Sequence, residues 1–232
     1  MGFEENGKMK AVTLSYDDGV TQDIRLIELL NKYNLKCTFN LNSENLSKKG
    51  MLIRNNKRIA HYKIHIDDVK QVYEGHEIAV HTLTHPNLMK CDDDEIIRQV
   101  EVDRLNLSEI AGYEVVGMAY PGGTTDERVA NIIKQNTGVK YSRTVVETHN
   151  FDIQEDLLRF NPTVIHLDFE KMMSLGQEFI ELKTNTPKIF YIWGHSYEMD
   201  YEEDYWVKLE EFFKLISNKE DIFYGTNREV LL

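Results

Sequence analysis

Apolar and polar residues along the chain follow two alternating periods. In residues 10–17, KAVTLSYD, every second residue is apolar, which predicts a β-strand. From Thr21, a suitable N-cap, apolar residues recur at helical spacing to about residue 30. Further strands are expected at 37–42, 76–81 and 115–121, and in VKYSRTV, TVIHL, KIFYIWGH and DIFYGT. Further helices are expected at 67–74, at 92–111, from Thr125 to Gly138, and at 204–217.

This succession of strands and helices predicts an α/β fold. Repeated β-α alternation favours a parallel sheet with helices outside, either a barrel or an open doubly wound sheet. Residues 42–65 are less regular and are expected to form a long excursion. Without a repeat or a flexible linker in the sequence, we expect residues 1–232 to form one domain.

The composition is that of a soluble globular protein, with 41% hydrophobic and 28% charged residues. The net charge of −12 disfavours a nucleic-acid partner, because phosphate binding requires clustered Lys and Arg. It does not argue against a neutral ligand such as a sugar.

The sequence does not predict a membrane span, a signal peptide or a disulfide framework. No apolar run approaches the roughly 20 residues that span a bilayer. MGFEENGKMK lacks the apolar core of a signal peptide, so we expect a cytoplasmic protein or a secreted one already trimmed of its leader. Cys37 and Cys91 are far apart and are expected to be plain buried or half-buried thiols.

Polar or glycine-rich segments follow four of the predicted strands. Asp17 and Asp18 precede Gly19, His81 and His195 each end a strand, and Pro-Gly-Gly follows another at 121–123. In parallel α/β folds the carboxyl ends of the strands share one face, where active sites are assembled. This convergence predicts a site more strongly than any one motif.

Two histidine pairs have metal-ligand spacing. His81 and His85 are four residues apart in HTLTH, and His61 and His65 have the same spacing in HYKIH. Because His81 ends a strand and His61 follows no strand signal, we expect the first pair to be the ligands and the second to lie on a solvated helix face.

A divalent cation would explain two adjacent carboxylates. One carboxylate of the Asp17–Asp18 pair could bind the cation together with His81 and His85, and the positive charge would offset the repulsion within the pair. Two imidazoles and one carboxylate, with open positions, suit a catalytic zinc or a related transition metal.

Three motifs in order resemble the polysaccharide deacetylases, or family-four carbohydrate esterases, which share a homology domain with the nodulation chitooligosaccharide deacetylase. They are LSYDDG, HTLTHP and a strand ending in the histidine of IWGH. The resemblance extends from about Lys10 to the last strand. It implies a distorted (β/α) barrel with about seven strands.

The resemblance also implies roles for individual residues. Asp17 would be the general base and His195 the general acid. Asp18 would bind the metal together with His81 and His85. Zinc is expected, although this ligand set also accepts cobalt, nickel or iron.

The third family motif departs from the usual pattern. The family has an arginine that pairs with the base, whereas GMAYPGG has none and Gly122 stands where an aromatic is usual. Arg143, at another strand end, could supply the missing charge; a surface salt bridge is the alternative. A backbone N–H of the Tyr120 to Gly122 turn is expected to bind the oxyanion.

The fourth family motif, an Asp-rich stretch with tryptophan, has no clear match. The groove that selects substrate is therefore expected to differ from the family's. Glu198 and Asp200 receive no role from the sequence.

The resulting prediction is a metal-dependent hydrolase that removes acetyl groups from an N-acetylated oligo- or polysaccharide. An O-acetylated glycan would use the same machinery. Two alternatives remain: hydrolysis of a small cyclic amide or imide, favoured by a short closed pocket, and a non-catalytic glycan-binding module. The acid and base residues argue against the second, since a pure binder needs neither.

Overall fold

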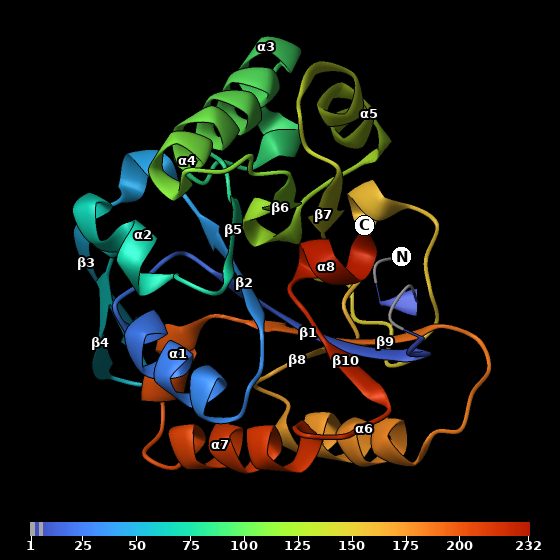
Figure 1. Cartoon of the computed structure of the whole chain (residues 1–232). Coiled ribbons are helices and arrows are strands. Elements are labelled where there is room, and N and C mark those ends of the chain that lie inside the picture. The colour runs from blue at the N-terminus through green and yellow to red at the C-terminus, as the bar shows by residue number, and fades with distance from the viewer. Residues whose placement is uncertain (1–2, 5–6) are drawn as a thin grey trace.

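A mostly parallel sheet forms the centre of the computed structural model, which describes residues 3–4 and 7–232 (Figure 1). Its strands in chain order are β1 (Lys10–Asp17), β2 (Cys37–Leu41), β5 (Glu77–Val80), β6 (Gly117–Ala119), β7 (Tyr141–Arg143), β8 (Val164–Ile165), β9 (Lys188–Gly194) and β10 (Ile222–Tyr224). Their order across the sheet is β7-β6-β5-β2-β1-β9-β8, with β10 paired to β1. Each of these named strand pairs is parallel, as the sequence predicts.

Strand β1 is the axis of this sheet. It pairs with β9 on one side, and with β10 and then β2 on the other. All eight of its residues are buried, so the alternation seen in the sequence separates two packed faces of the strand. The side chains at its carboxyl end therefore lie in the middle of the molecule.

Helices cover the sheet on the outside, and α6 and α7 pack side by side (Figure 1). The helices are α1 (Gln22–Lys32), α2 (Val69–Val72), α3 (Asp93–Ile97), α4 (Asp103–Ala111), α5 (Glu127–Asn136), α6 (Phe169–Glu181), α7 (Tyr205–Ile216) and α8 (Asn227–Leu231). Among the described residues, none of these helices has the length and apolar character needed to cross a bilayer.

The predicted helix at 92–111 contains a π-helical turn. Helix α3 passes through Arg98–Val102 in π geometry before α4 continues to Ala111. Gly112 then ends the helix at φ 80°, as its position in the sequence predicts. The helix predicted from Thr125 is instead capped by Asp126, whose side chain accepts the N–H of Val129.

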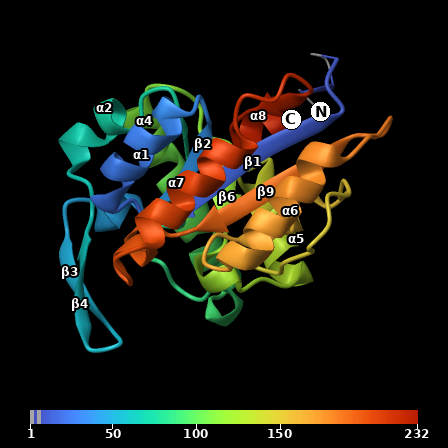
Figure 2. The same ribbon diagram turned by 90° about the horizontal axis from the view of Figure 1, so that it is seen from below.

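The excursion at 42–65 holds an antiparallel hairpin that the sequence pattern did not predict. Strands β3 (Lys49–Arg54) and β4 (Lys57–Tyr62) are joined by Asn55 and Asn56, both at positive φ, as a two-residue hairpin turn requires. The hairpin extends away from the sheet (Figure 2). His61 lies in β4 and His65 beyond its end, so the expected helix face for this pair is wrong.

Candidate active site

Asp18, His81 and His85 form a cluster at the carboxyl ends of β1 and β5. One ligand atom from each lies within 4.8 Å of the others. The two imidazole rings are 4.8 Å apart between centroids and nearly perpendicular, at 69°. Among the described residues this is the one cluster with the donor set of a metal site. The histidines of HTLTH therefore lie next to Asp18 of YDDG.

The backbone turns that carry these ligands are strained. Asp18 has φ 83° and His85 φ 65°, values that are uncommon for residues with a side chain. Gly19 continues the first turn at φ 61°, and a Cβ there would lie 2.6 Å from the Leu41 Cδ2 atom. Strain of this kind costs about 1–3 kcal/mol per residue and clusters at functional sites.

His81 is held in the orientation of a metal ligand. Its Nδ1–H donates to the carbonyl of Ala119, 2.8 Å away on β6. The lone pair is then on Nε2, which is buried and has no hydrogen-bond partner. Burial lowers the pKa of His81 to about 4, so the ring is neutral at pH 7. A buried lone pair without a donor is costly, and a cation shared with Asp18 and His85 would satisfy it.

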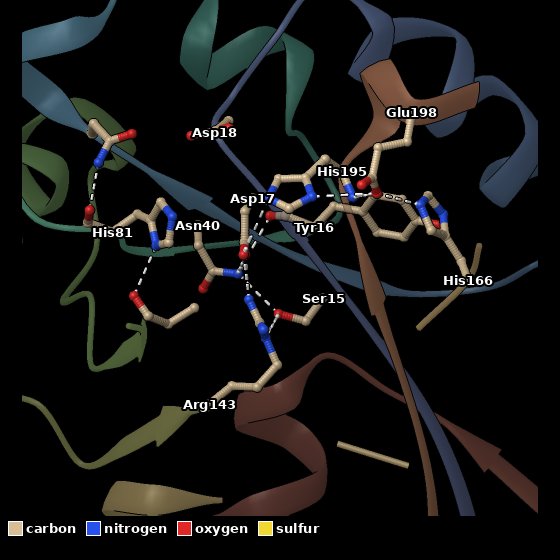
Figure 3. Close-up of polar contacts among 12 residues, drawn as sticks. Ser15, Tyr16, Asp17, Asp18, Asn40, His81, Arg143, His166, His195 and Glu198 are labelled. Carbon is tan, nitrogen blue, oxygen red and sulfur yellow. Dashed lines mark hydrogen bonds and ion pairs between the residues drawn. The ribbon is translucent and has the colours of Figure 1, made fainter. Parts of the chain in front are cut away.

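Asp17, the other carboxylate, points toward Arg143 (Figure 3). The Arg143 Nη2 atom is 2.5 Å from both carboxylate oxygens, and the amide of Asn40 donates to Oδ1 at 2.8 Å. Burial would raise the pKa of Asp17, but the Arg143 guanidinium, together with His81 and His195, outweighs burial and lowers that pKa. Arg143 is fully buried, so this pair is not a surface salt bridge.

His195 lies on the other side of Asp17 and is backed by Glu198. Its Nε2 is 3.9 Å from the Asp17 Oδ2 atom, and its Nδ1 is 3.3 Å from the Glu198 Oε2 atom. The same oxygen lies 2.8 Å from His166 Nε2, and Tyr16 contacts the far nitrogen of His166 at 2.8 Å (Figure 3). Burial would lower the pKa of His195, but the carboxylates, Glu198 first, raise it to about 9.

The turn after β6 offers one backbone donor. The Tyr120 N–H donates to the carbonyl of Arg143 and its hydroxyl donates to the carbonyl of Leu158, so the Tyr120 side chain points into the core. Pro121 has no N–H. In the Tyr120 to Gly122 turn this leaves the N–H of Gly122, a residue at φ 58° with open space where a Cβ would be.

The β3–β4 hairpin reaches the metal cluster through two side chains. His61 Nε2 is 3.3 Å from the Asp18 Oδ2 atom, and Lys63 Nζ is 3.2 Å from Oδ1. Burial would raise the pKa of Asp18, but His61, Lys63 and the same two histidines that lower the pKa of Asp17 together outweigh burial, so that this pKa lies well below its ordinary value. A pocket of about 390 Å³ opens here, bordered by the hairpin, Asp18, His85 and Tyr197.

The structure thus gathers the predicted acid, base and ligand residues at one sheet edge and adds others that the sequence did not single out. Asn40 could have been found, because it lies at the end of the predicted strand next to Asp17. Glu198 receives no role from its position in the sequence, because its contacts with His195 and His166 appear only in the structure.

His61 has metal-ligand spacing with His65 in the sequence, but the expected helix face does not place it beside Asp18. No motif assigns a role to Lys63, the residue after β4.

The sequence model of the polysaccharide deacetylases matches residues 4–141, more than half of the chain. The chain belongs to this family. Over 104 residues it is 35% identical to a peptidoglycan-N-acetylglucosamine deacetylase of Bacillus cereus, an alignment that covers 44% of this chain and 32% of that protein. Over 95 residues it is 30% identical to a chitooligosaccharide deacetylase of a Bradyrhizobium strain, covering 39% and 36%. The chain thus spans about a third of these relatives.

Solved structures of the family share the fold. A family-four carbohydrate esterase from Streptomyces lividans, in complex with acetate, superimposes with a TM-score of 0.56 at 12% identity, covering 93% of this chain and 91% of that one. A family-four pseudoenzyme from Bacillus anthracis gives 0.55 at 18% identity, covering 97% and 66%. The distorted (β/α) barrel expected for this member of the family is therefore confirmed, with seven parallel strands in the main path.

Proposed function

We propose that this chain is a metal-dependent deacetylase that removes acetyl groups from an N-acetylated glycan. The observation that carries the proposal is the convergence of Asp18, His81 and His85 within 4.8 Å, beside an acid–base pair. That pair is Asp17 and His195, whose side chains approach to 3.9 Å. Zinc is the proposed metal, because two imidazoles and one carboxylate with open positions suit it.

When bound, the metal would polarise the acyl carbonyl and lower the pKa of water. The Asp17 carboxylate, ionised because of Arg143, accepts the proton of the attacking water. The Gly122 N–H donates to the oxygen that becomes negative. His195, protonated at neutral pH because of Glu198, gives its Nε2 proton to the departing amine, which is a poor leaving group until then.

The pocket and the acid–base pair favour this proposal over the alternatives. The pocket beside Asp18 is lined on its outer side by exposed residues of the hairpin, such as Lys48 and Gly50, so it is not the closed pocket expected for a small cyclic amide. The acid–base pair disfavours a non-catalytic glycan-binding module.

The proposal predicts metal-dependent release of acetate. Chitooligosaccharides, peptidoglycan fragments and acetylated xylan would be incubated with the protein, with and without a chelator, and acetate would be measured. We expect release from at least one N-acetylated substrate, its loss with chelator and its recovery with added zinc. His81→Ala should lose both bound zinc and activity. Absence of acetate from every substrate with zinc bound would refute the proposal.

Glu198→Gln is expected to move the basic limb of the pH–rate profile to lower pH. His195 must be protonated to act as the acid, so kcat/KM should fall as pH rises through its pKa of about 9. Removing the Glu198 charge lowers that pKa, and we expect a shift of roughly one unit or more. Glu203→Gln, an exposed carboxylate on the same loop, is the control. A lower rate with an unmoved basic limb would mean that Glu198 acts on structure alone.

A further inference from the structure

The β3–β4 hairpin has a charge opposite to that of the rest of the chain. Residues 48–63 contain six Lys or Arg residues and no Asp or Glu, whereas the whole chain has a net charge of −12. A local positive charge on an acidic protein attracts an anionic group to one place while the remaining surface repels extended polyanions. The location of this positive charge therefore indicates where an anionic group would bind.

One face of the hairpin directs this charge at the candidate active site. Gly50 is opposite His61 in the register, and the Lys63 N–H donates to the Lys48 carbonyl at 2.8 Å. These four residues line the pocket that also contains Asp18. Side chains alternate between the faces of a hairpin, so Arg58, opposite the 77% exposed Ile53, belongs to the other face.

Lysines exceed carboxylates among the residues that line this pocket. The lining includes the side chains of Lys48 and Lys63 on this face, with Asp18 as its one carboxylate. Lys49 also borders the pocket, but its ammonium lies 5.8 Å from the centroid of the Tyr62 ring. Lys63 is paired with Asp18, whereas the Lys48 ammonium donates to the neutral side chain of Asn45 at 2.9 Å. The Lys48 charge is thus available to a ligand.

The pocket lining also includes an aromatic ring, that of Tyr197. The Tyr197 ring lies between His61 and His195, with ring centroids 5.0 Å and 5.1 Å away. Lys57 ties the hairpin to the loop after His195, because its ammonium donates to the Tyr201 carbonyl at 2.8 Å. An aromatic ring beside ammonium groups suits a sugar ring that carries an anionic substituent.

We propose that the hairpin selects acetylated glycans that bear a carboxylate or a phosphate close to the acetylated sugar, with Lys48 as a principal contact. This inference rests on the proposed function and narrows its substrate class. A nucleic acid is disfavoured as the occupant, because the whole chain has 39 acidic and 27 basic residues and would repel an extended polyanion.

The test compares three N-acetylglucosamine tetramers: neutral, carboxylated at C6 and phosphorylated at C6. Calorimetry at low salt with the full chain should show at least one charged tetramer binding about tenfold more tightly than the neutral one. Added salt should reduce this preference. Lys48→Glu should abolish it, while Arg58→Glu, which changes the net charge equally on the other face, should retain it. The charged tetramer that binds more tightly shows whether the hairpin prefers a carboxylate or a phosphate.

Equal binding of all three tetramers, or equal effects of Lys48→Glu and Arg58→Glu, would overturn the inference. Acetate release, measured in parallel, separates this outcome from failure of the proposed function. If neither the tetramers nor any of the chitooligosaccharides, peptidoglycan fragments and acetylated xylan releases acetate with zinc bound, but the preference and its dependence on Lys48 persist, the selection of an anionic glycan stands and the deacetylase proposal is wrong.

Discussion

Asp17→Asn is expected to lose most of its turnover while zinc binding persists. An amide in place of the carboxylate keeps the size of the side chain but cannot accept the proton of the attacking water. General acid–base groups contribute about 10²- to 10⁴-fold to a rate, so kcat should fall within that range. Metal content after dialysis against zinc, together with acetate release, measures both properties in one preparation.

Asp18→Asn is the matched comparison for this prediction. Asp18 is the neighbouring carboxylate, and it lies in the cluster with His81 and His85. We therefore expect this variant to lose zinc as well as activity, unlike Asp17→Asn. Near-normal turnover in Asp17→Asn would show that the base is another group, and loss of zinc in that variant would place Asp17 among the ligands.

Arg143→Met is expected to lower the free energy of unfolding by about 3 kcal/mol or more, because breaking a buried ion pair leaves an uncompensated charge. Arg143 is fully buried, and the Asp17 side chain is 3% exposed. The pKa of Asp17, which Arg143 lowers, should rise. The stability difference from the parent protein should therefore shrink as pH falls and Asp17 becomes protonated. Urea unfolding at several pH values measures this difference.

Two variants complete the stability experiment. Arg143→Met combined with Asp17→Asn should recover part of the lost stability, because the buried carboxylate is then neutral. Arg98→Met removes an exposed pair with Glu95 and should change stability by less than about 1 kcal/mol. If Arg143→Met changed the free energy of unfolding as little as Arg98→Met does, the ion pair with Asp17 would not stabilise the fold.

The main features of the fold could be predicted from the sequence, because they depend on local patterns. Alternation of apolar residues identified β1, and Gly112 identified the end of α4. Irregular features were missed where a local rule was overridden or weak. The turn at Asn55 and Asn56 lies in a segment without a regular apolar pattern, and Arg98–Val102 forms a π turn inside an otherwise regular helix.

Averaged composition concealed one property of the chain. The net charge of −12 describes the whole sequence and led to an expectation about nucleic acid alone. The six basic residues of 48–63 indicate an anion-binding surface only once the register of β3 and β4 is known. That register places two of them, Lys48 and Lys63, on the face that borders the pocket. Composition sums over positions, whereas binding depends on which charges are neighbours.

By itself the sequence determined which residue types stand at the ends of which strands, and parallel pairing then brought Asp18, His81 and His85 to one edge. Only the tertiary structure decided what lies against them. Arg143 meets Asp17 from 126 residues away. Contacts this distant in the chain follow from packing of the whole sheet, and local sequence patterns do not contain them.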